Sequence, residues 1–552
     1  MSFRVGLRWM VVVVALAGVR RVEGQAAAPA GAARPACEPD LTKPSAADRA
    51  LLARNYSDAE RLYGAALTAD PASGVAMAGL VRTAIAEGKL PEALAMALAD
   101  AKAHPNDAAV QDALGEVRFR RGEVDEAAMA FNLSQHLDPC SGLTHYDVGR
   151  FFNLSGMYKT AQRELDRAHT LAPENQEITR QWRSTHAVPL TAEQRLAMLK
   201  TQLENPALTD DRKDGITAAI KGIEAREKGD CELVSPVTEA KLPILQITNG
   251  SGVSPQDMYA GGLEVQFNGK KRRLEIDTGA SGLLLSRSVA KSAGLVPELE
   301  SKAGGIGDSG TAGVFVTHVD DIKIGKMEFK NCMVRVLEQS GVLDVDGLIG
   351  PDVFRDYLVT LDFPGREVRI GPLPKRPDDE AGETTSLATS DEGDSTPLSM
   401  ADRAKDRYIA PEMKGWSPVF RSQHFLIVPT LIGNAPLKLF LMDTGASRGM
   451  ISPAAAREVT HVSNDNDARV KGINGKVQNV QVADKVTIAF AGVKQLLPDM
   501  QSFDTGSLSK SAGVEISGLI GFPTLRELVI SIDYRDNLIH VVYDLNKGYH
   551  FR

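Results

Sequence analysis

Two copies of an Asp-Thr-Gly triplet carry the side chains that could do chemistry in this chain. The first lies in Leu274-Glu-Ile-Asp-Thr-Gly-Ala-Ser281 and the second in Leu439-Phe-Leu-Met-Asp-Thr-Gly-Ala-Ser447. Two carboxylates held together cannot both ionise easily, so such a pair shares one proton. The charged member can then take a proton from water while the protonated member donates to a carbonyl oxygen. We therefore predict that Asp277 and Asp443 activate water directly, with no metal, cofactor or covalent intermediate.

Each aspartate is predicted to follow a β-hairpin. In the first copy, Asn268-Gly269 suits a two-residue turn in which both positions need positive φ. In the second copy, Asn434 precedes Asp443 by the same spacing that separates Asn268 from Asp277. The flanking strands are expected over residues 263–267, 273–276, 425–432 and 437–442.

The similarity between the copies continues beyond the triplets. Gly347-Leu-Ile-Gly350 matches Gly518-Leu-Ile-Gly521, and each motif runs into an apolar strand. Asp362 and Asp533 occupy matching places in those strands and are interpreted as structural. The second half is therefore a diverged duplicate of the first. A third triplet, Asp504-Thr-Gly506, has no such hairpin before it and is interpreted as a surface loop.

These motifs resemble the two lobes of pepsin-like and retroviral-type aspartic proteases. In that family each lobe supplies one Asp-Thr-Gly loop, with a hydrophobic-hydrophobic-Gly stretch packed beside it. The resemblance implies an all-β bilobal fold, with lobe 1 over residues 241–372 and lobe 2 over 407–552. It also implies that Thr278 and Thr444 cross-link the two loops through their hydroxyls. Gly279 and Gly445 permit the tight turns and let backbone approach the carboxylates.

Two glycine-containing segments lie where each lobe's flap hairpin would sit, namely 303–308 and 470–475. Their glycines suit a mobile closure over a cleft. The alternative is a plain surface turn. The flap candidates are Gly305, Ile306, Gly307, Gly472 and Ile473.

Alanine stands three positions after each aspartate, at Ala280 and Ala446. In this position the chain resembles retroviral-type enzymes, which also have alanine. Pepsin-like enzymes usually have Ser or Thr, whose hydroxyl supports the outer carboxylate oxygen. With fewer hydrogen bonds to the anion its pKa should be higher, so we expect activity that is not restricted to strong acid.

A regular period marks the N-terminal third of the chain. Prolines recur every 34 residues, at 71, 105, 139 and 173. Alanines at 59, 93, 127 and 161 have the same spacing. The pattern resembles tetratricopeptide repeats, and we expect an all-α solenoid over residues 47–187. Such solenoids hold a protein or peptide on their concave face, although this one could instead be only a spacer or packing platform.

The remaining segments are interpreted as a signal and connectors. Residues 1–26 have arginines before a short apolar run and are expected to be a signal peptide, so the chain is predicted to be exported to a periplasmic or extracellular compartment with no stable membrane span after signal removal. We expect an Ala/Pro spacer over 27–46, a helical cap and linker over 188–240, and a disordered linker over 373–406.

Composition excludes several classes of function. With 552 residues, 43% hydrophobic and 24% charged, the chain is ordinary multidomain globular protein. A net charge of −8 without a basic face gives no case for nucleic acid. The four cysteines are widely spaced and show no metal-ligand pattern. They could form up to two disulfides in an oxidising compartment, or they could be unpaired buried thiols.

The sequence therefore predicts an exported aspartic endopeptidase that hydrolyses polypeptides, with a repeat domain that docks a protein or peptide. Two alternatives remain open. The lobes could be active only when each pairs with its twin in another chain, or the cleft could bind peptides without cutting them.

Overall fold

A computed structural model describes residues 37–186, 192–205, 231–235, 237–248, 258–303, 312–339, 343–377, 405–464, 470–473, 475–477 and 479–543, with isolated positions between 208 and 224 and Ile306. The predicted signal peptide, most of the 373–406 linker and residues 544–552 lie outside this part of the chain. None of the helices described is both long and apolar enough to cross a membrane.

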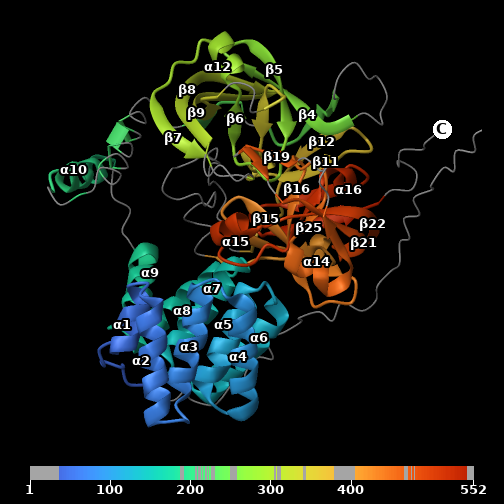
Figure 1. Cartoon of the computed structure of the whole chain (residues 1–552). Helices are drawn as coiled ribbons and strands as arrows, with labels where there is room; N and C mark the ends of the chain where they lie inside the picture. The colour runs from blue at the N-terminus through green and yellow to red at the C-terminus, as the bar shows by residue number, and fades with distance from the viewer. Residues whose placement is uncertain are drawn as a thin grey trace, which may run out of the picture.

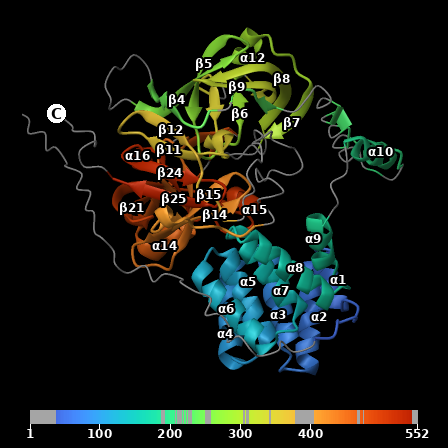
Figure 2. The same ribbon diagram turned by 180° about the vertical axis from the view of Figure 1, so that it is seen from behind.

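Three bodies lie in a row that does not follow their order in the sequence. The helical repeats pack against lobe 2, and lobe 1 lies on the far side of lobe 2 (Figures 1 and 2). The chain thus passes from the repeats to the distant lobe and then returns to build the lobe that touches the repeats.

The repeat region is a stack of antiparallel helix pairs, which confirms the predicted solenoid. Ser73, Asp107 and Ser141 cap three successive first helices, and each accepts a hydrogen bond from a main-chain N–H three residues on. Gly88, Gly122 and Gly156 have φ of +80°, +71° and +77° at the turns between helices. The helices are α1 Ala46–Leu52, α2 Tyr56–Ala69, α3 Gly74–Ala86, α4 Leu90–Ala103, α5 Ala108–Arg120, α6 Val124–Leu137, α7 Gly142–Leu154, α8 Tyr158–Leu171 and α9 Gln176–His186.

The end of the solenoid is covered by α9 rather than by the segment we expected. Ile178 of α9 is fully buried beside Tyr146 and Leu165, and Trp182 stacks on His169 with ring centroids 4.2 Å apart. The next helix, α10 (Ala192–Leu203), lies away from the solenoid in both views (Figures 1 and 2). α9 therefore covers the last apolar face of the repeats, a role that we had expected of residues 188–240.

Lobe 1 is built around a nine-stranded sheet in the order β1-β9-β6-β10-β5-β4-β8-β7, with β3 on β4. The predicted Asn268-Gly269 turn joins β4 to β5, with φ of +48° and +79°. The elements are β1 Glu232–Leu233, β3 Leu245–Thr248, β4 Met258–Phe267, β5 Lys270–Ile276, β6 Leu283–Leu285, α12 Arg287–Ala293, β7 Leu299–Ala303, β8 Ala312–Ile324, β9 Met327–Leu337, β10 Gly347–Ile349 and the 3₁₀ turn η2 Pro351–Phe354.

Lobe 2 repeats the plan with an eight-stranded sheet in the order β14-β15-β16-β23-β17-β22-β21-β18. In both lobes the Asp-bearing strand pairs in parallel with the Gly-Leu-Ile strand. The elements are η3 Pro411–Met413, β14 Phe420–Ser422, β15 Phe425–Ile432, β16 Lys438–Asp443, β17 Met450–Ile451, α14 Pro453–Val459, β18 Val462–Asn464, β19 Val470–Gly472, β20 Gly475–Val477, β21 Gln481–Phe490, β22 Val493–Ser502, α15 Gly506–Ala512, β23 Gly518–Gly521 and α16 Phe522–Leu525.

A six-stranded sheet shared by both lobes holds them together. Its central strands β11 and β24 pair across the approximate twofold axis, where the Thr360 and Ser531 hydroxyls lie 2.9 Å apart. Phe363 and Phe522 pack edge to face beneath it, inside one continuous apolar core. The strands are β2 Ala240–Pro243, β11 Leu358–Asp362, β12 Glu367–Gly371, β13 Ser417–Pro418, β24 Val529–Asp533 and β25 Leu538–Val542.

The repeats dock onto lobe 2 through their inter-helix turns. Glu515 N donates to Arg120 O at 2.7 Å, and Arg407 N donates to Gly156 O at 3.2 Å. Leu439 of β16 joins an apolar cluster with Phe119 and other repeat residues. The strand that carries Asp443 is therefore braced from behind by the solenoid.

Two disulfides settle the pairing that the sequence left open. Cys37 joins Cys140, so the C-terminal end of the predicted 27–46 spacer is fixed to the repeats. Cys231 joins Cys332 beside β1, which pairs with β9 of lobe 1. Lobe 1 therefore begins before residue 241, because the disulfide and β1 bring part of the predicted linker onto its sheet.

Candidate active site

The two Asp-Thr-Gly loops meet where the lobes join and are cross-linked by their threonines. Thr278 Oγ1 donates to Met442 O at 2.7 Å and accepts from Thr444 N at 3.0 Å. Thr444 Oγ1 donates to Ile276 O at 2.7 Å and accepts from Thr278 N at 2.9 Å. Both threonines are buried, so the four bonds form in a site without competing water.

The loop glycines leave room for the carboxyl group of the opposite lobe. A Cβ on Gly279 would lie 3.0 Å from the Asp443 Cγ, and one on Gly445 would lie 2.5 Å from the Asp277 Cγ. Neither glycine has a positive φ. Their role is therefore close approach of the two acids, and not an unusual backbone conformation.

The two carboxyl groups are neighbours but are not equivalent. Asp443 accepts from the N–H groups of Gly445 and Ala446, both at 3.0 Å, whereas Asp277 accepts only from Gly279 N at 2.8 Å among the described main-chain donors. Burial raises the pKa of both, and the pKa of Asp277 is raised further by the neighbouring Asp443 and Glu275 carboxylates. The pKa of Asp277 is therefore the more strongly raised of the two.

Glu275 is a third buried acid at this site, and our sequence analysis missed it. It lies two residues before Asp277 on β5 and is 7% exposed. Burial, together with the Asp443 charge, raises its pKa to about 8. The signal was present in the sequence, because the matching position of the second copy, Leu441, is apolar.

The lobe 1 loop is also held by residues that the sequence analysis did not single out. Asp352 accepts from the Ser281 hydroxyl at 2.7 Å and from Gly282 N at 2.9 Å. His424, from lobe 2, donates from Nε2 to Gly279 O at 3.0 Å. Burial lowers the pKa of His424 to about 4, so the ring is neutral near pH 7. These contacts fix the loop from both lobes.

Hairpin segments from the two lobes meet across the site. A Cβ on Gly472, at the end of β19, would collide with Ile306 O. Ile473 packs with Leu284 and Leu348 of lobe 1, whereas Ile306 packs with the lobe 2 cluster. Each tip thus covers the opposite lobe, while the candidates Gly305 and Gly307 lie outside the described residues.

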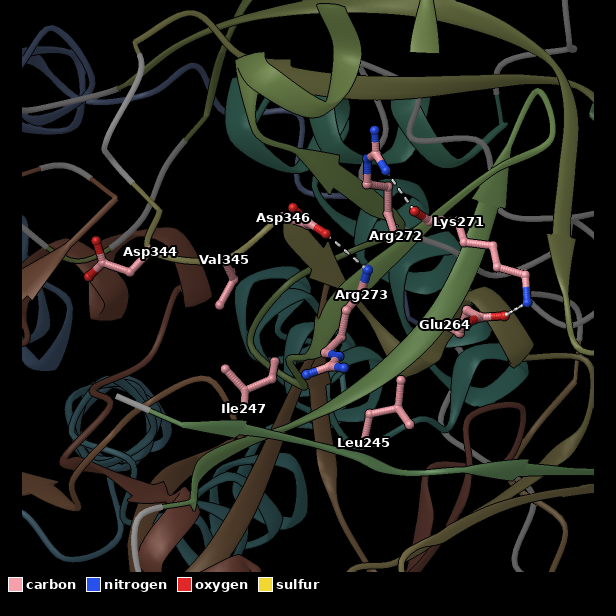
Figure 3. Close-up of a pocket in the computed structure, with 9 residues that line it drawn as sticks. All are labelled: Leu245, Ile247, Glu264, Lys271, Arg272, Arg273, Asp344, Val345 and Asp346. Carbon is pink, nitrogen blue, oxygen red and sulfur yellow. Dashed lines mark hydrogen bonds and ion pairs between the residues drawn. The ribbon is translucent and has the colours of Figure 1, made fainter. Parts of the chain in front are cut away.

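A pocket of about 410 Å³ lies on lobe 1, beside β5, and does not include either catalytic candidate (Figure 3). Its lining is mostly charged: Lys271 pairs with Glu264 at 2.7 Å, and Asp346 accepts from Arg273 N at 3.1 Å. In lobe 2 the corresponding place holds Leu437, Lys438 and Leu439, which the repeats cover.

The other acids singled out by sequence lie outside the site. Asp504 is exposed and accepts from Gly506 N at 2.9 Å at the start of α15. Asp362 closes a turn by accepting from Gly365 N at 2.7 Å, and Asp533 does the same with Asp536 N at 2.9 Å. In the described part of the chain, no group of three or more His, Cys, Asp or Glu side chains is placed to hold a metal ion.

Comparison with known families agrees with this geometry. Residues 263–356 match the family described as "gag-polyprotein putative aspartyl protease", and residues 50–117 match the tetratricopeptide repeat. The chain combines tetratricopeptide repeats with an aspartic protease-type fold, as its motifs predicted.

Curated relatives match over a short stretch. The chain is 31% identical over 103 residues to DNA damage-inducible protein 1 of Neurospora crassa, covering 18% of this chain and 23% of that protein. It is 31% identical over 110 residues to UBA domain-containing protein Mud1 of Schizosaccharomyces pombe, covering 20% and 32%. The chain therefore spans a third or less of the length of these relatives.

Among solved structures, an aspartic proteinase from Irpex lacteus matches 57% of this chain and 100% of its own, at 11% identity and a TM-score of 0.34. A retropepsin-like aspartic protease from Rickettsia conorii matches 26% of this chain and 92% of its own, at 20% identity and a TM-score of 0.18.

Proposed function

We propose that the chain is an aspartic endopeptidase with Asp277 and Asp443 as its catalytic pair. One observation carries this proposal. The Thr278–Thr444 cross-link brings two buried carboxyl groups together within one chain, where each acid influences the pKa of the other. Placing two like acids together is costly, and such strain is concentrated at functional sites.

The asymmetry of the pair assigns a role to each acid. Ionised Asp443 takes a proton from water as the oxygen attacks the peptide carbonyl carbon, while Asp277 gives its proton to the carbonyl oxygen. The resulting gem-diol then collapses as the C–N bond breaks. The amide nitrogen receives the proton held by Asp443, and Asp277 takes a proton back from one hydroxyl of the diol, which becomes the new carbonyl oxygen. Thr278, Gly279, Thr444 and Gly445 hold the two acids in this geometry.

The segments around Ile306 and Ile473 act as flaps in this proposal. Their contacts on opposite lobes suit a cover that excludes water from a bound peptide and opens to release products. A polypeptide must displace these contacts to enter.

The repeats serve two purposes in our proposal. They brace β16 of lobe 2, and they recruit a protein or peptide on their inner helices. Those helices carry a buried ionic ladder in which Arg82 pairs with Asp112 at 2.5 Å and Glu116 at 3.1 Å. Export to a periplasmic or extracellular compartment is likewise proposed, and both disulfides support it because such bonds persist in oxidising compartments.

The decisive experiment incubates the purified chain with a mixed peptide library, with and without a statine-type transition-state mimic. Wild type should cleave and the mimic should block cleavage. Asp277→Asn and Asp443→Asn should each abolish cleavage while gel filtration shows an unchanged folded species. Cleavage that persists in either variant would reject the assignment, and activity confined to a dimer fraction would favour pairing of lobes between chains.

A further inference from the structure

Glu275 shares a face of β5 with the catalytic candidate Asp277. Side chains alternate along a strand, and the flanking Leu274 and Ile276 are buried in the main core at 0% and 2% exposure. Glu275 therefore points to the opposite face, which is the face on which Asp277 lies. Its electrostatic influence on the pKa of Asp277 agrees with this placement.

The neighbours of Glu275 place it under the cover of the site. It lies between Gly262 of β4 and Leu348 of β10 in the register of the sheet. Leu348 packs with Ala280, which follows the catalytic loop, and with Ile473 at the tip of the lobe 2 hairpin. Glu275 thus lies next to the space where a peptide would cross the catalytic pair.

No partner for the Glu275 carboxyl group occurs among the described residues. Gly262 offers no side chain and Leu348 is apolar, while Arg273, two residues earlier on the same face, donates from its guanidinium to Gln246 O at 3.1 Å. The side chain is 7% exposed, and neither carboxyl oxygen is among the fully enclosed atoms that lack a partner in the described residues, so the oxygens reach solvent. A ligand bound over the catalytic pair can therefore supply the partner that the described residues do not.

The matching position in lobe 2 is different. Leu441, at the position equivalent to Glu275, is 3% exposed and belongs to the apolar cluster that Ile306 covers. The approximate twofold site therefore has one acidic wall and one apolar wall. Because the two halves of the site differ, the two orientations of a bound peptide are not equivalent, and a peptide would bind in one orientation only.

We propose, resting on the proposed peptidase function, that Glu275 is a specificity-determining residue that binds a lysine or arginine side chain flanking the scissile bond, with an apolar residue on the other side of that bond. The substrate cation supplies the partner that the described part of the chain lacks, and its charge favours the ionised form of Glu275. A neutral substrate side chain would leave the acid unpaired.

The test uses the purified full chain and peptides that differ only at the two residues flanking the cleaved bond. Wild type should cleave peptides with Lys or Arg on one side of the bond with a kcat/KM about tenfold or more above the Met peptide, as expected for a buried charged pair. Glu275→Leu, which copies Leu441, should abolish this ratio, and Glu275→Gln should reduce it.

The matched control is Glu264→Gln, because Glu264 is an exposed acid of the same sheet that pairs with Lys271 instead. Its Lys/Met ratio should equal that of wild type. Equal cleavage of Lys and Met peptides by wild type, or an unchanged ratio in Glu275→Leu, would overturn the inference.

A binding measurement separates this inference from the proposed function. Uncleavable hydroxyethylene versions of the Lys and Met peptides are titrated into wild type by calorimetry. A preference for Lys that disappears in Glu275→Gln supports the pocket even if no peptide is cleaved. Equal affinities for the two analogues reject the pocket even if cleavage by the Asp277–Asp443 pair is established.

Discussion

Alanine at the two loop glycines should give unequal losses of activity. Gly445→Ala places a Cβ 2.5 Å from the Asp277 Cγ and 2.7 Å from both its oxygens, whereas Gly279→Ala places one 3.0 Å from the Asp443 Cγ. Ordinary contact begins at 3.4 Å, so the Asp277 carboxyl group must retreat more than twice as far as the Asp443 carboxyl group. Both positions have an ordinary φ, so no backbone strain complicates the comparison.

A reacting group misplaced by about 1 Å can lose roughly 100-fold in rate, and the retreat of Asp277 approaches that displacement. We therefore expect Gly445→Ala to lower kcat/KM by about 100-fold and Gly279→Ala by less than about tenfold. The assay is hydrolysis of a peptide from the library screen, with thermal unfolding of each variant as the control for folding. Equal losses in the two variants, or a Gly445→Ala enzyme close to wild type, would refute the argument that these glycines act by making space for the opposite acid.

Three further predictions test other parts of the structure. Thr278→Val should lower stability in denaturant unfolding by about 1–3 kcal/mol, because it leaves the buried Met442 O and Thr444 N without the Thr278 hydroxyl. Thr278→Ser keeps the hydroxyl and should retain most of the wild-type stability. Equal stability of the Val and Ser variants would contradict the cross-link. Glu275 binds its proton more tightly in the folded state, with a pKa of about 8 against an ordinary value of 4.5, so wild type should lose stability as pH rises from 4.5 to 8. The free energy of unfolding of Glu275→Gln, relative to wild type, should therefore rise by up to about 5 kcal/mol across that range. Denaturant unfolding at about pH 5 and about pH 8.5 measures this change. A difference between the two proteins that does not depend on pH would rule out the raised pKa. Gly88→Ala and Gly156→Ala share the cost of a positive φ, about 1 kcal/mol, but only the Gly156 Cβ meets lobe 2, where it collides with Asn537 Nδ2, while Gly88 faces open space. Gly156→Ala should therefore lower the unfolding temperature more than Gly88→Ala, and the reverse order would speak against docking of the repeats.

Much of the site was readable from the duplicated motif. Asp277 and Asp443, their threonines and their glycines come together as the resemblance implied, because each residue is tied to a short strand-turn pattern. The repeats were readable for a similar reason. Their period fixes caps, turn glycines and helix-ending prolines within a single repeat, and these are interactions between near neighbours in the chain.

Other features depend on segments that are far apart in the sequence. Glu275 looks like an ordinary polar residue on a strand until the folded sheet buries it between Gly262 and Leu348. The docking of the repeats on lobe 2 requires Leu439 to meet Phe119, on a helix from a much earlier part of the chain, and the return of the chain from lobe 1 makes that possible. The cysteine pairing likewise follows from which strands and loops become neighbours.

The sequence by itself determined the two Asp-Thr-Gly loops, the doubled β architecture and the helical repeats, since local patterns of strand, turn and helix encode them. Only the tertiary structure decided which of the two aspartates has the more strongly raised pKa, that Glu275 is buried beside them, and which lobe the solenoid braces. Those properties arise from burial and from charges on distant segments, and burial is decided only when the whole chain has folded.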